Sequence, residues 1–485
     1  MAAPPLRAVV LYGTGDPTAN TTAPSGTLAG SGWQYEGQLN GLDGTVIASN
    51  YFVTAKHIGG NVGDTFIFNG VNYTVTAGFP DPFSDVRIWQ VAGSFPIHAP
   101  IFSGAPGSEV NLALVVIGRG RQRGSPVLVG SDSHLGGWLW GTSDNVQRWG
   151  TNVVGSIFTD STYGDLLRVP FDSNAGPNEA HLSPGDSGGA VFILNTATNN
   201  WELAGINLAA DGPFSTSSTG VNSFNATMFD TTGLFVPDAV GGWTTSPNPS
   251  AFYSTEIAAH KGFIQSVVMQ LTSVVSRKIH GLAGTFDVDL PETGQPGIEC
   301  RSGGVNNNYT LVFTFAQNVT VQNAAVSTGT GNVTSFSVAG NTVTVNLTQV
   351  VNLQRIVVKL VSVNDGTNIS DVQATMDVVV GDTTANDKVN SSDVSQTQSQ
   401  SGQAVTAANF REDVTANGSI NSSDISLVQS KSGTGLTGAS APTNTEPSVP
   451  NLSIKPLPVP EPPRSLRSAP RNQRTNGSWK LENGS

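Results

Sequence analysis

The sequence predicts a mainly all-β chain with several domains, on three observations. Its 485 residues include 55 glycines, and threonine, serine and asparagine are also abundant, a composition that favours short strands joined by tight turns. Short segments of alternating apolar and polar residues recur along the chain. Near its end, one polar segment occurs twice, 31 residues apart. We therefore expect β-rich domains followed by a small repeat module.

Two neighbouring apolar segments near the N-terminus are predicted to form a hairpin that ends at a histidine. Gly44–Ala48 is the first strand, and Tyr51–His57 is the second. A further strand follows Asp85, because Val86, Ile88 and Val91 are apolar. Asp85 lies 28 residues after His57 and is our preferred partner for this histidine. The competing carboxylate, Asp81, lies in a Pro-Asp-Pro turn and does not begin a strand.

The stretch His181–Ala190 contains Gly-Asp-Ser-Gly-Gly, in which Ser187 lies in a turn of small residues. The flanking glycines permit a sharp bend that directs the N–H groups of Gly185 and Ser187 at one oxygen, as an oxyanion hole requires. A serine hydroxyl is a weak nucleophile and needs an adjacent base, usually a histidine that a carboxylate orients. The chain offers His57, Asp85 and Ser187 in that order.

These segments resemble those of the trypsin/chymotrypsin-like serine proteases of the bacterial, extracellular type. The resemblance covers about residues 25 to 272, and the order histidine, aspartate, serine is that of chymotrypsin. It implies a double six-stranded β-barrel and peptide-bond hydrolysis through an acyl-enzyme on Ser187. His57 would be the base, Asp85 the orienting carboxylate, and Gly185 and Ser187 the oxyanion hole. The chemistry would need no cofactor.

Residues around the serine loop are expected to form the substrate pocket. Ala190–Leu194 and Trp201–Leu208 predict a hairpin, and the resemblance places Asn207 and Leu208 along the pocket. His181 would form its base, where a trypsin-like enzyme has an aspartate, which argues against a simple preference for lysine or arginine. Two alternatives remain open: His181 binds an acidic or polar side chain, or it fills space.

Phe252–Leu271 is predicted to be a helix, since its apolar residues fall roughly on one face. The resemblance also implies a helix at the end of the barrels.

The chain departs from the animal digestive enzymes in ways that concern Asp186. It lacks an Ile-Val-Gly-Gly start, so we expect no new N-terminus to neutralise this carboxylate. A buried Asp186 would then need another cation. Arg119, Arg121 and Arg123 are the candidates, although they equally fit a solvated basic loop.

The single cysteine, Cys300, excludes a disulfide framework.

Composition bounds the partners and the location of the chain. The net charge is −12, and only 12% of residues are charged, which disfavours nucleic acid and anionic membranes as partners. No apolar run approaches the roughly 20 residues of a membrane span. The N-terminus shows no evident signal peptide, yet the composition indicates a secreted or cell-surface protein.

Residues 276–380 are predicted to form a β-sandwich. Several short segments there alternate apolar and polar residues, and Gly/Asn-rich turns separate them. Clear examples are Tyr309–Phe315, Thr342–Leu347 and Ile356–Leu360. The region has no catalytic cluster and no aromatic platform for carbohydrate. We interpret it as a spacer or binding module.

The repeat pairs Asp382–Val394 with Asp413–Ile425. Oxygen-bearing residues at its positions 1, 3, 5, 9 and 12 match an EF-hand-type loop, whose hard oxygens suit calcium. The paired half-motifs resemble a type I dockerin domain, expected over residues 381–435. The predicted calcium ligands are Asp382, Asn386, Lys388, Asn390 and Asp393 in the first loop, and Asp413, Asn417, Ser419, Asn421 and Asp424 in the second.

Two departures should weaken calcium binding, more so in the first loop. Position 3 is Thr384 or Thr415, and position 6 of the first loop is Asp387 where glycine is usual. The serine pairs Ser391–Ser392 and Ser422–Ser423 fall where dockerins contact cohesin partners. A cohesin-type protein is therefore a possible partner, and the alternative is that calcium only stabilises a helix pair.

Residues 436–485 are rich in proline, cannot bury a core, and are expected to be disordered or extended. The three domains that precede this tail are expected at 1–275 for the protease domain, 276–380 for the sandwich and 381–435 for the dockerin-like repeats.

The resulting hypothesis is a secreted serine endopeptidase, a hydrolase of protein or peptide substrates, attached to partners or a surface by the dockerin-like module. The alternative is a non-catalytic adhesin or scaffold component that uses the barrel as a binding surface.

Overall fold

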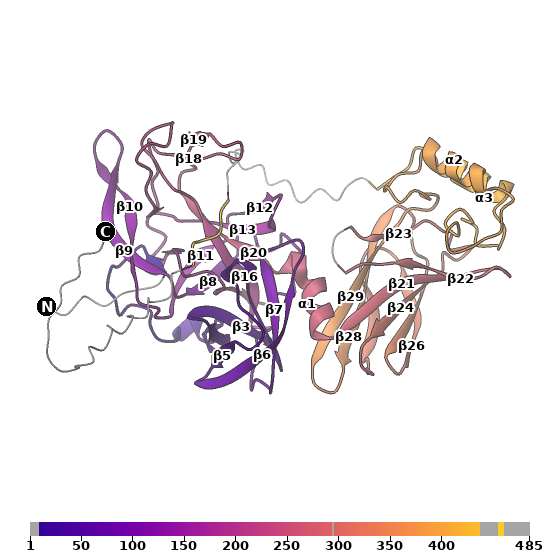
Figure 1. The fold of residues 1–485 in the computed structure, drawn as a ribbon, viewed down its shortest axis with the longest axis horizontal. Helices are drawn as coiled ribbons and strands as arrows, with labels where there is room; N and C mark the ends of the chain where they lie inside the picture. Colours follow the sequence, from indigo (N-terminus) through magenta and orange to yellow (C-terminus); the bar gives the residue numbers. More distant parts are fainter. Residues whose placement is uncertain (1–8, 293–294, 437–453, 460–485) are drawn as a thin grey trace, which may run out of the picture.

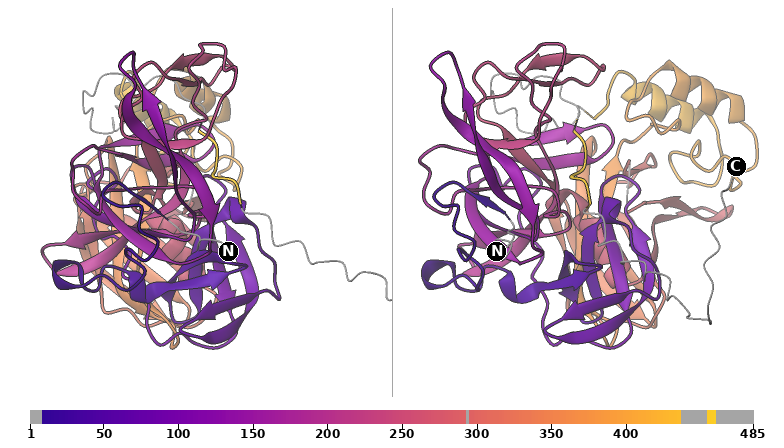
Figure 2. Two further views of the ribbon diagram at one scale, coloured as in Figure 1. Left: turned by 90° about the vertical axis from the view of Figure 1, so that its left-hand side faces the viewer. Right: turned by 60° about the vertical axis from the view of Figure 1, so that its left-hand side comes forward.

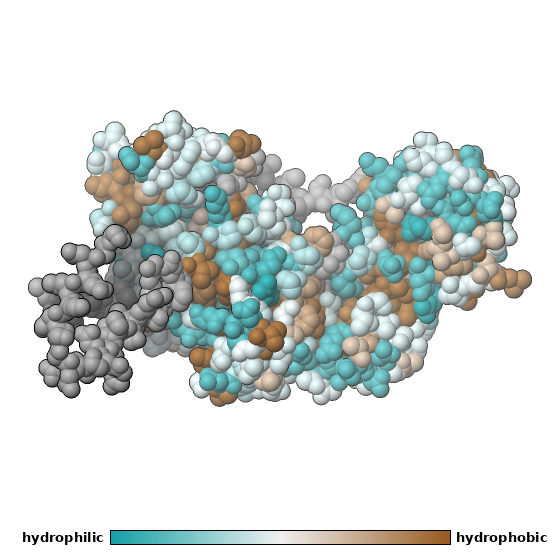
Figure 3. All heavy atoms as spheres, in the orientation of Figure 1, coloured by the Kyte–Doolittle hydropathy of each residue, from teal (hydrophilic) through white to brown (hydrophobic). Residues whose placement is uncertain are grey.

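The computed structural model describes residues 9–292, 295–436 and 454–459. Strands dominate, and the helices are few and short (Figure 1). Among the described residues, no helix is long and apolar enough to cross a membrane. The face seen in Figure 3 is mostly hydrophilic and carries scattered apolar patches. The predominance of strands confirms the prediction of a mainly β chain.

The first strands form a closed six-stranded barrel in the order β2-β3-β4-β7-β6-β5. Its strands are β2 (Glu36–Leu39), β3 (Leu42–Ala48), β4 (Tyr51–Ala55), β5 (Thr65–Phe68), β6 (Val71–Pro80) and β7 (Val86–Val91). Aromatic side chains fill the interior: Phe52 and Phe66 stack with ring centroids 3.8 Å apart, and Trp89 lies beside Phe52. The prediction of a six-stranded barrel is confirmed for this half.

The next region contains a seven-stranded sheet in the order β11-β8-β15-β16-β20-β13-β12. Its strands are β8 (Ala113–Gly118), β11 (Arg148–Val153), β12 (Ser156–Asp160), β13 (Gly164–Pro170), β15 (Ala190–Asn195), β16 (Asn200–Ala210) and β20 (Ala251–Glu256). Within the described residues its backbone ladder does not close, unlike the predicted second six-stranded barrel. The Asn152 side chain of the edge strand β11 donates to the carbonyls of Pro170 in β13 and Ala180 in β14 (Ala180–His181).

Smaller sheets flank this sheet. One has the order β17-β10-β9, and the others are the pairs β1-β14 and β18-β19. Their bounds are β1 (Val10–Leu11), β9 (Arg121–Val129), β10 (His134–Ser143), β14 (Ala180–His181), β17 (Ala226–Met228), β18 (Phe235–Pro237) and β19 (Trp243–Thr245). Short 3-10 turns are η1 (Gly26–Leu28), η2 (Trp33–Tyr35), η3 (Lys56–Ile58) and η4 (Ala258–His260).

The helix predicted over Phe252–Leu271 is wrong in its first part. Ala251–Glu256 is strand β20, and the helix α1 covers only Lys261–Val268. All six residues of β20 are buried, because it pairs with β13 on one side and β16 on the other. Pairing on both edges therefore outweighs the helical spacing of the apolar residues.

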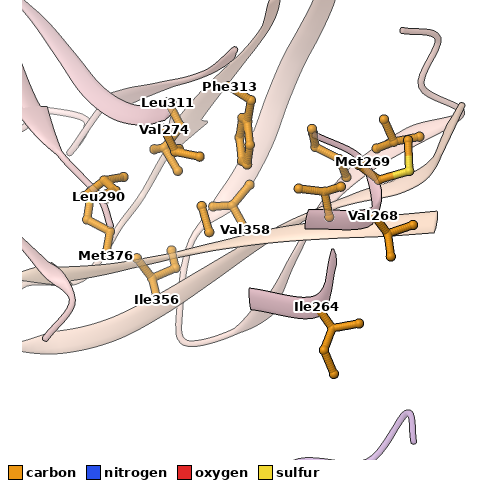
Figure 4. Close-up of a cluster of buried hydrophobic side chains, with 14 of the residues drawn as sticks. Ile264, Val268, Met269, Val274, Leu290, Leu311, Phe313, Ile356, Val358 and Met376 are labelled. Carbon is orange, nitrogen blue, oxygen red and sulfur yellow. The ribbon is translucent and has the colours of Figure 1, made fainter. Parts of the chain in front are cut away.

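Two sheets follow, in the orders β22-β21-β24-β27-β26 and β23-β29-β28-β25. The first contains β21 (Leu271–His280), β22 (Gly284–Asp289), β24 (Tyr309–Phe315), β26 (Asn332–Ala339) and β27 (Thr342–Thr348). The second contains β23 (Gly297–Glu299), β25 (Asn323–Thr328), β28 (Gln354–Asn364) and β29 (Ile369–Val378). Leu311 and Phe313 face Ile356 and Val358 across the core (Figure 4), which is the arrangement of a β-sandwich. Strand β21 spans residue 276, the predicted domain boundary.

The repeat folds into two loops, each followed by a helix: α2 (Ser391–Gln400) and α3 (Ser422–Lys431). Each helix begins with a capping box, Asn390 with Asp393 and Asn421 with Asp424. These caps satisfy the first N–H groups of each helix.

A chain of buried polar groups ties the second loop to the sandwich. Asp413 Oδ2 lies 2.9 Å from His280 Nδ1, and both side chains are fully buried. His280 Nε2 lies 3.2 Å from the guanidinium of Arg301. Arg301 in turn donates two hydrogen bonds, of 2.8 and 2.7 Å, to Glu299. Burial raises the pKa of Glu299, but Arg301 outweighs burial and lowers it to about 2.

Part of the proline-rich tail is ordered and extended, so the predicted disorder of residues 436–485 is wrong for this part, whereas the extended alternative agrees with it. Residues Ile454–Val459 are described, and Leu457 is only 2% exposed. The segment lies against β16 and is the yellow piece within the first half of the molecule (Figure 2). Apart from Leu436, the remainder of the predicted tail lies outside the described residues.

Glu299→Gln should destabilise the protein far more than Asp287→Asn, its matched control in the exposed ion pair with Arg277. Removing one partner of a buried pair typically costs about 3–5 kcal/mol, whereas an exposed pair contributes about 0.2–1 kcal/mol. The folded-state pKa of Glu299 lies below its ordinary 4.5, so its contribution is present above pH 4.5 and is lost as pH falls towards 2. Chemical denaturation at pH 7 and pH 3 checks both points, and equal losses in the two variants would contradict them.

Candidate active site

His57 and Asp85 lie side by side because their strands pair. His57 follows β4 in the short turn η3, and Asp85 immediately precedes β7. The antiparallel register sets Ala55 opposite Val86. Lys56 holds this junction, since its ammonium group donates to the carbonyl of Asp81 at 2.8 Å and to that of Ser84. Local strand pairing thus brings together two residues that are 28 positions apart.

The three predicted catalytic side chains form one hydrogen-bonded line. Asp85 Oδ2 lies 2.5 Å from His57 Nδ1, and Asp85 Oδ1 accepts the backbone N–H of His57 at 2.9 Å. His57 Nε2 lies 2.8 Å from Ser187 Oγ. A carboxylate at Nδ1 favours a proton on that nitrogen, which leaves Nε2 free to accept the serine proton.

Asp81, the competing carboxylate, faces a different histidine. Its Oδ2 lies 2.6 Å from His260 Nδ1, and it also accepts a hydrogen bond from the Ser84 hydroxyl. Burial raises the pKa of Asp81, but the bond to His260 and the other hydrogen bonds outweigh it and lower the pKa. The geometry therefore favours Asp85 as the partner of His57.

The serine loop has the conformation that its glycines permit. Gly185 and Gly188 have φ values of +100° and +84°, in the left-handed region that favours glycine. Asn207 fixes the loop from β16: its carbonyl accepts the N–H of Gly188 at 3.1 Å, and its side chain donates to the carbonyl of Asp186 at 3.2 Å. In the described part of the chain, the N–H groups of Gly185 and Ser187 have no protein acceptor. They are therefore available to an incoming oxygen.

Asp186 is hydrogen-bonded by backbone donors and has no cationic partner among the described residues. Its carboxylate is fully buried and accepts N–H hydrogen bonds from Gly120 at 2.6 Å, Ser183 at 2.8 Å and Val9 at 3.4 Å. Burial raises its pKa to about 7. The N-terminal segment thus reaches Asp186 through the backbone amide of Val9, which supplies a hydrogen bond and no charge.

The three candidate arginines lie elsewhere, so their predicted pairing with Asp186 is wrong. Arg119 pairs with Asp43 of the barrel at 2.5 Å. Arg121 donates from its guanidinium to the carbonyl of Gly141. Arg123 packs over the Trp138 ring at 3.7 Å from its centroid. Over the described residues, no salt bridge reaches Asp186.

His181 lies in the core beneath the serine loop. It is fully buried, its Nδ1 lies 2.8 Å from the carbonyl of Leu182, and the rings of Phe171 and Phe252 flank it edge-on. Burial lowers its pKa to about 4, so the imidazole is neutral at physiological pH. This environment favours the space-filling interpretation over recognition of an acidic side chain.

The loops of the repeat carry oxygen donors, the ligand type that a hard cation such as calcium prefers. In the first loop, the Thr384 hydroxyl lies 2.8 Å from Asp393 and 3.4 Å from Asp382, so two carboxylates converge. Burial and the nearby Asp393 raise the pKa of Asp382, and a bound cation would relieve this repulsion. Asp387 at position 6 has φ +64°, the strained conformation that the sequence predicts there.

Other features limit the calcium sites. In the second loop, Asp413 is already paired with His280, and Thr415 donates to Asp424 at 2.8 Å. Across the described residues, no cluster of three or more His, Cys, Asp or Glu side chains is suited to a metal. The remaining predicted ligands lie in the loops, where their side-chain or backbone groups hydrogen-bond locally: Asn386, Lys388, Asn390, Asn417, Ser419 and Asn421.

Comparison with known proteins leaves the family of the chain unassigned. No protein-family model and no curated protein matches it. Among solved structures, it is similar to the secreted serine protease VesC from Vibrio cholerae, with 12% identity and a TM-score of 0.30 over 72% of this chain and 70% of that chain. A likeness at this level is too distant to assign a family.

Asp186→Asn should remove a pH-dependent term from the stability of the protein. The folded-state pKa of about 7 lies above the ordinary 3.8, so Asp186 stabilises the fold most below pH 3.8 and this contribution is lost as pH rises through 7. Relative to Asp186→Asn, the wild type should lose on the order of 4 kcal/mol between pH 4 and pH 8. Denaturation curves across this range measure it, with exposed Asp16→Asn as the control. A constant difference between wild type and Asp186→Asn would contradict the assignment.

Proposed function

We propose that the chain is a serine endopeptidase of the chymotrypsin-like type. The single observation that supports this most strongly is the line of hydrogen bonds from Asp85 through His57 to Ser187, at 2.5 and 2.8 Å. Asp85 and Ser187 are almost fully buried, whereas His57 is 15% exposed. A base that retains some access to solvent suits a residue that exchanges protons with substrate and water.

The proposed reaction follows from this geometry. Ser187 Oγ attacks the carbonyl carbon of a peptide bond while His57 Nε2 accepts its proton. The N–H groups of Gly185 and Ser187 stabilise the resulting oxyanion. His57 then donates the proton to the leaving nitrogen, the C–N bond breaks, and an acyl-enzyme remains on Ser187. Water, activated by His57, hydrolyses this ester, while Asp85 keeps the imidazole oriented and stabilises its charged form.

The competing hypothesis is a non-catalytic adhesin or scaffold component that uses the barrel as a binding surface. It requires neither the alignment of His57 with Ser187 nor two unoccupied N–H donors beside the serine. Both features are present together, and therefore favour the enzyme.

We further propose that the protein is secreted and that the loops around Asp393 and Asp424 form a dockerin-like module that binds calcium. In the first loop the carboxylate oxygens at positions 1 and 12 would hold the ion, assisted by amide and backbone oxygens. In the second loop the ion would have to share Asp413 with His280. The bound ion would link each loop to the start of α2 or α3, because Asp393 and Asp424 also cap these helices. A cohesin-type protein is the proposed partner of this module.

Ser187→Ala should abolish covalent labelling by a fluorophosphonate probe, because the probe reacts with an activated serine hydroxyl. Asp85→Asn should slow peptide hydrolysis by about 10⁴-fold, since the imidazole loses its orienting carboxylate. Exposed Ser173→Ala is the matched control and should label like the wild type. Labelling that persists in Ser187→Ala would refute Ser187 as the nucleophile.

Calcium titration by calorimetry should detect binding to the full chain, with one ion per loop. Asp393→Ala and Asp424→Ala should each remove the binding at one loop and lower the helical signal in circular dichroism, because each loses a ligand and a helix cap. Asp371→Ala, a half-buried aspartate on β29, serves as the control. If neither loop variant changes the titration, the calcium proposal is wrong.

A further inference from the structure

The ordered piece of the tail runs along β16 beside Ser187. The N–H of Leu457 donates to the carbonyl of Leu208 at 2.9 Å, and Pro456 forms an antiparallel bridge with Ala209. An extended segment that adds to the edge of a strand in this way is bound through its main chain. Leu208 is also one of the residues predicted to line the substrate pocket.

The carbonyl of Leu457 points towards the proposed nucleophile. Ser187 Oγ lies 3.5 Å from this carbonyl oxygen, and Ser187 is fully buried with the segment in place. The segment therefore covers the serine that a substrate must reach.

The Leu457 side chain is bound as an apolar group. It is 2% exposed and belongs to the buried cluster that contains Ala180 and Leu182, the two neighbours of His181. His181 is neutral and packed between aromatic rings. A buried apolar cluster of this kind suits a branched apolar side chain and offers no charge to an acidic or basic one.

The rest of the segment is suited to remain bound. Ile454 supplies a second apolar contact, against the clusters that contain Phe214 and Tyr253. Proline at 456 and 458 fixes φ and favours an extended backbone, so ordering the segment costs less entropy. Because the segment belongs to the same chain, its effective concentration at the cleft is high.

Resting on the proposed peptidase function, we propose that Ile454–Val459 is a built-in inhibitor that occupies the substrate cleft in the manner of a substrate. The Leu457 carbonyl oxygen accepts from Ser187 Oγ, while in the described part of the chain the N–H groups of Gly185 and Ser187 have no acceptor. A short shift of this carbonyl into the oxyanion hole would make Leu457 the residue before the bond that Ser187 attacks, and the cleft would then select peptides with leucine or a similar apolar residue there. Pro458 protects the segment from cleavage: its nitrogen carries a ring carbon where an ordinary amide carries hydrogen, and this carbon obstructs proton delivery from His57.

Leu457→Asp in the full chain tests the inhibitor. Losing a buried leucine side chain should raise the rate of fluorophosphonate labelling at Ser187 about 10- to 100-fold. Leu282→Asp makes the same change at a fully exposed leucine and should label at the wild-type rate. A synthetic peptide Ile-Lys-Pro-Leu-Pro-Val, added in excess, should slow labelling of Leu457→Asp again, which a misfolded variant would not show.

The outcomes separate this inference from the proposed function. Equal Ser187-dependent labelling of wild type and Leu457→Asp overturns the inhibitor and leaves the peptidase standing. No labelling in any variant overturns the peptidase itself. In Leu457→Asp, peptides with leucine before the cleaved bond should react faster than those with glutamate, and the reverse order overturns the pocket assignment.

Pro458→Ala tests the alignment of the segment with Ser187. Hydrolysis should then break the bond after Leu457, with the acyl group passing to Ser187 and then to water, and with the proton passing to the amine of residue 458. Intact-mass measurement should show loss of residues 458–485, and Ser187→Ala added to Pro458→Ala should prevent it. A Pro458→Ala chain that labels at Ser187 and stays intact overturns the placement of the Leu457 carbonyl.

Discussion

The contact between His57 Nε2 and Ser187 Oγ is the interaction on which the rest of the first half depends, because it crosses from the closed barrel to the seven-stranded sheet. A 2.8 Å bond between separate sheets requires that both sheets be fixed relative to each other. The ion pair between Arg119 and Asp43 contributes to this, since it joins the end of β8 to β3. Close packing contributes too: a side chain at Gly188 would collide with the carbonyl of Asp43.

Strand β16 connects the proposed chemistry to recognition. Asn207 holds the serine loop through its backbone and its side chain, while the next residue, Leu208, offers its carbonyl to the extended segment at Leu457. The same strand thus positions the nucleophile and binds the chain that the nucleophile would attack. This arrangement buries the Asp186 carboxylate, which is unfavourable. Hydrogen bonds from the backbone N–H groups of Gly120 and Ser183 offset part of this cost, and no arginine contributes.

Much of the site was predictable from the sequence, because its signals are local. The Gly-Asp-Ser-Gly-Gly turn, the strand that ends at His57 and the strand that follows Asp85 each occupy a few residues. The partners of the arginines were not predictable, since Arg119 pairs with a residue 76 positions away in another sheet. Strand β20 was not predictable, because the apolar residues of Phe252–Leu271 have helical spacing while the pairing of β20 with β13 and β16 is long-range. The contact of Leu457 with the site was not predicted, because the tail was judged by its proline-rich composition. The signal that could have pointed to it is the pair of apolar residues Ile454 and Leu457 among the prolines.

The most direct test of the proposed chemistry is to trap the acyl-enzyme. The full chain carrying Leu457→Asp, which frees the cleft, would be mixed with an activated ester of leucine, quenched in acid, digested and analysed by mass spectrometry. We expect the acyl mass on the peptide that contains Ser187, and its absence when His57→Ala is added. Ester hydrolysis with no adduct on that peptide, or an adduct that persists without His57, would contradict the proposed chemistry.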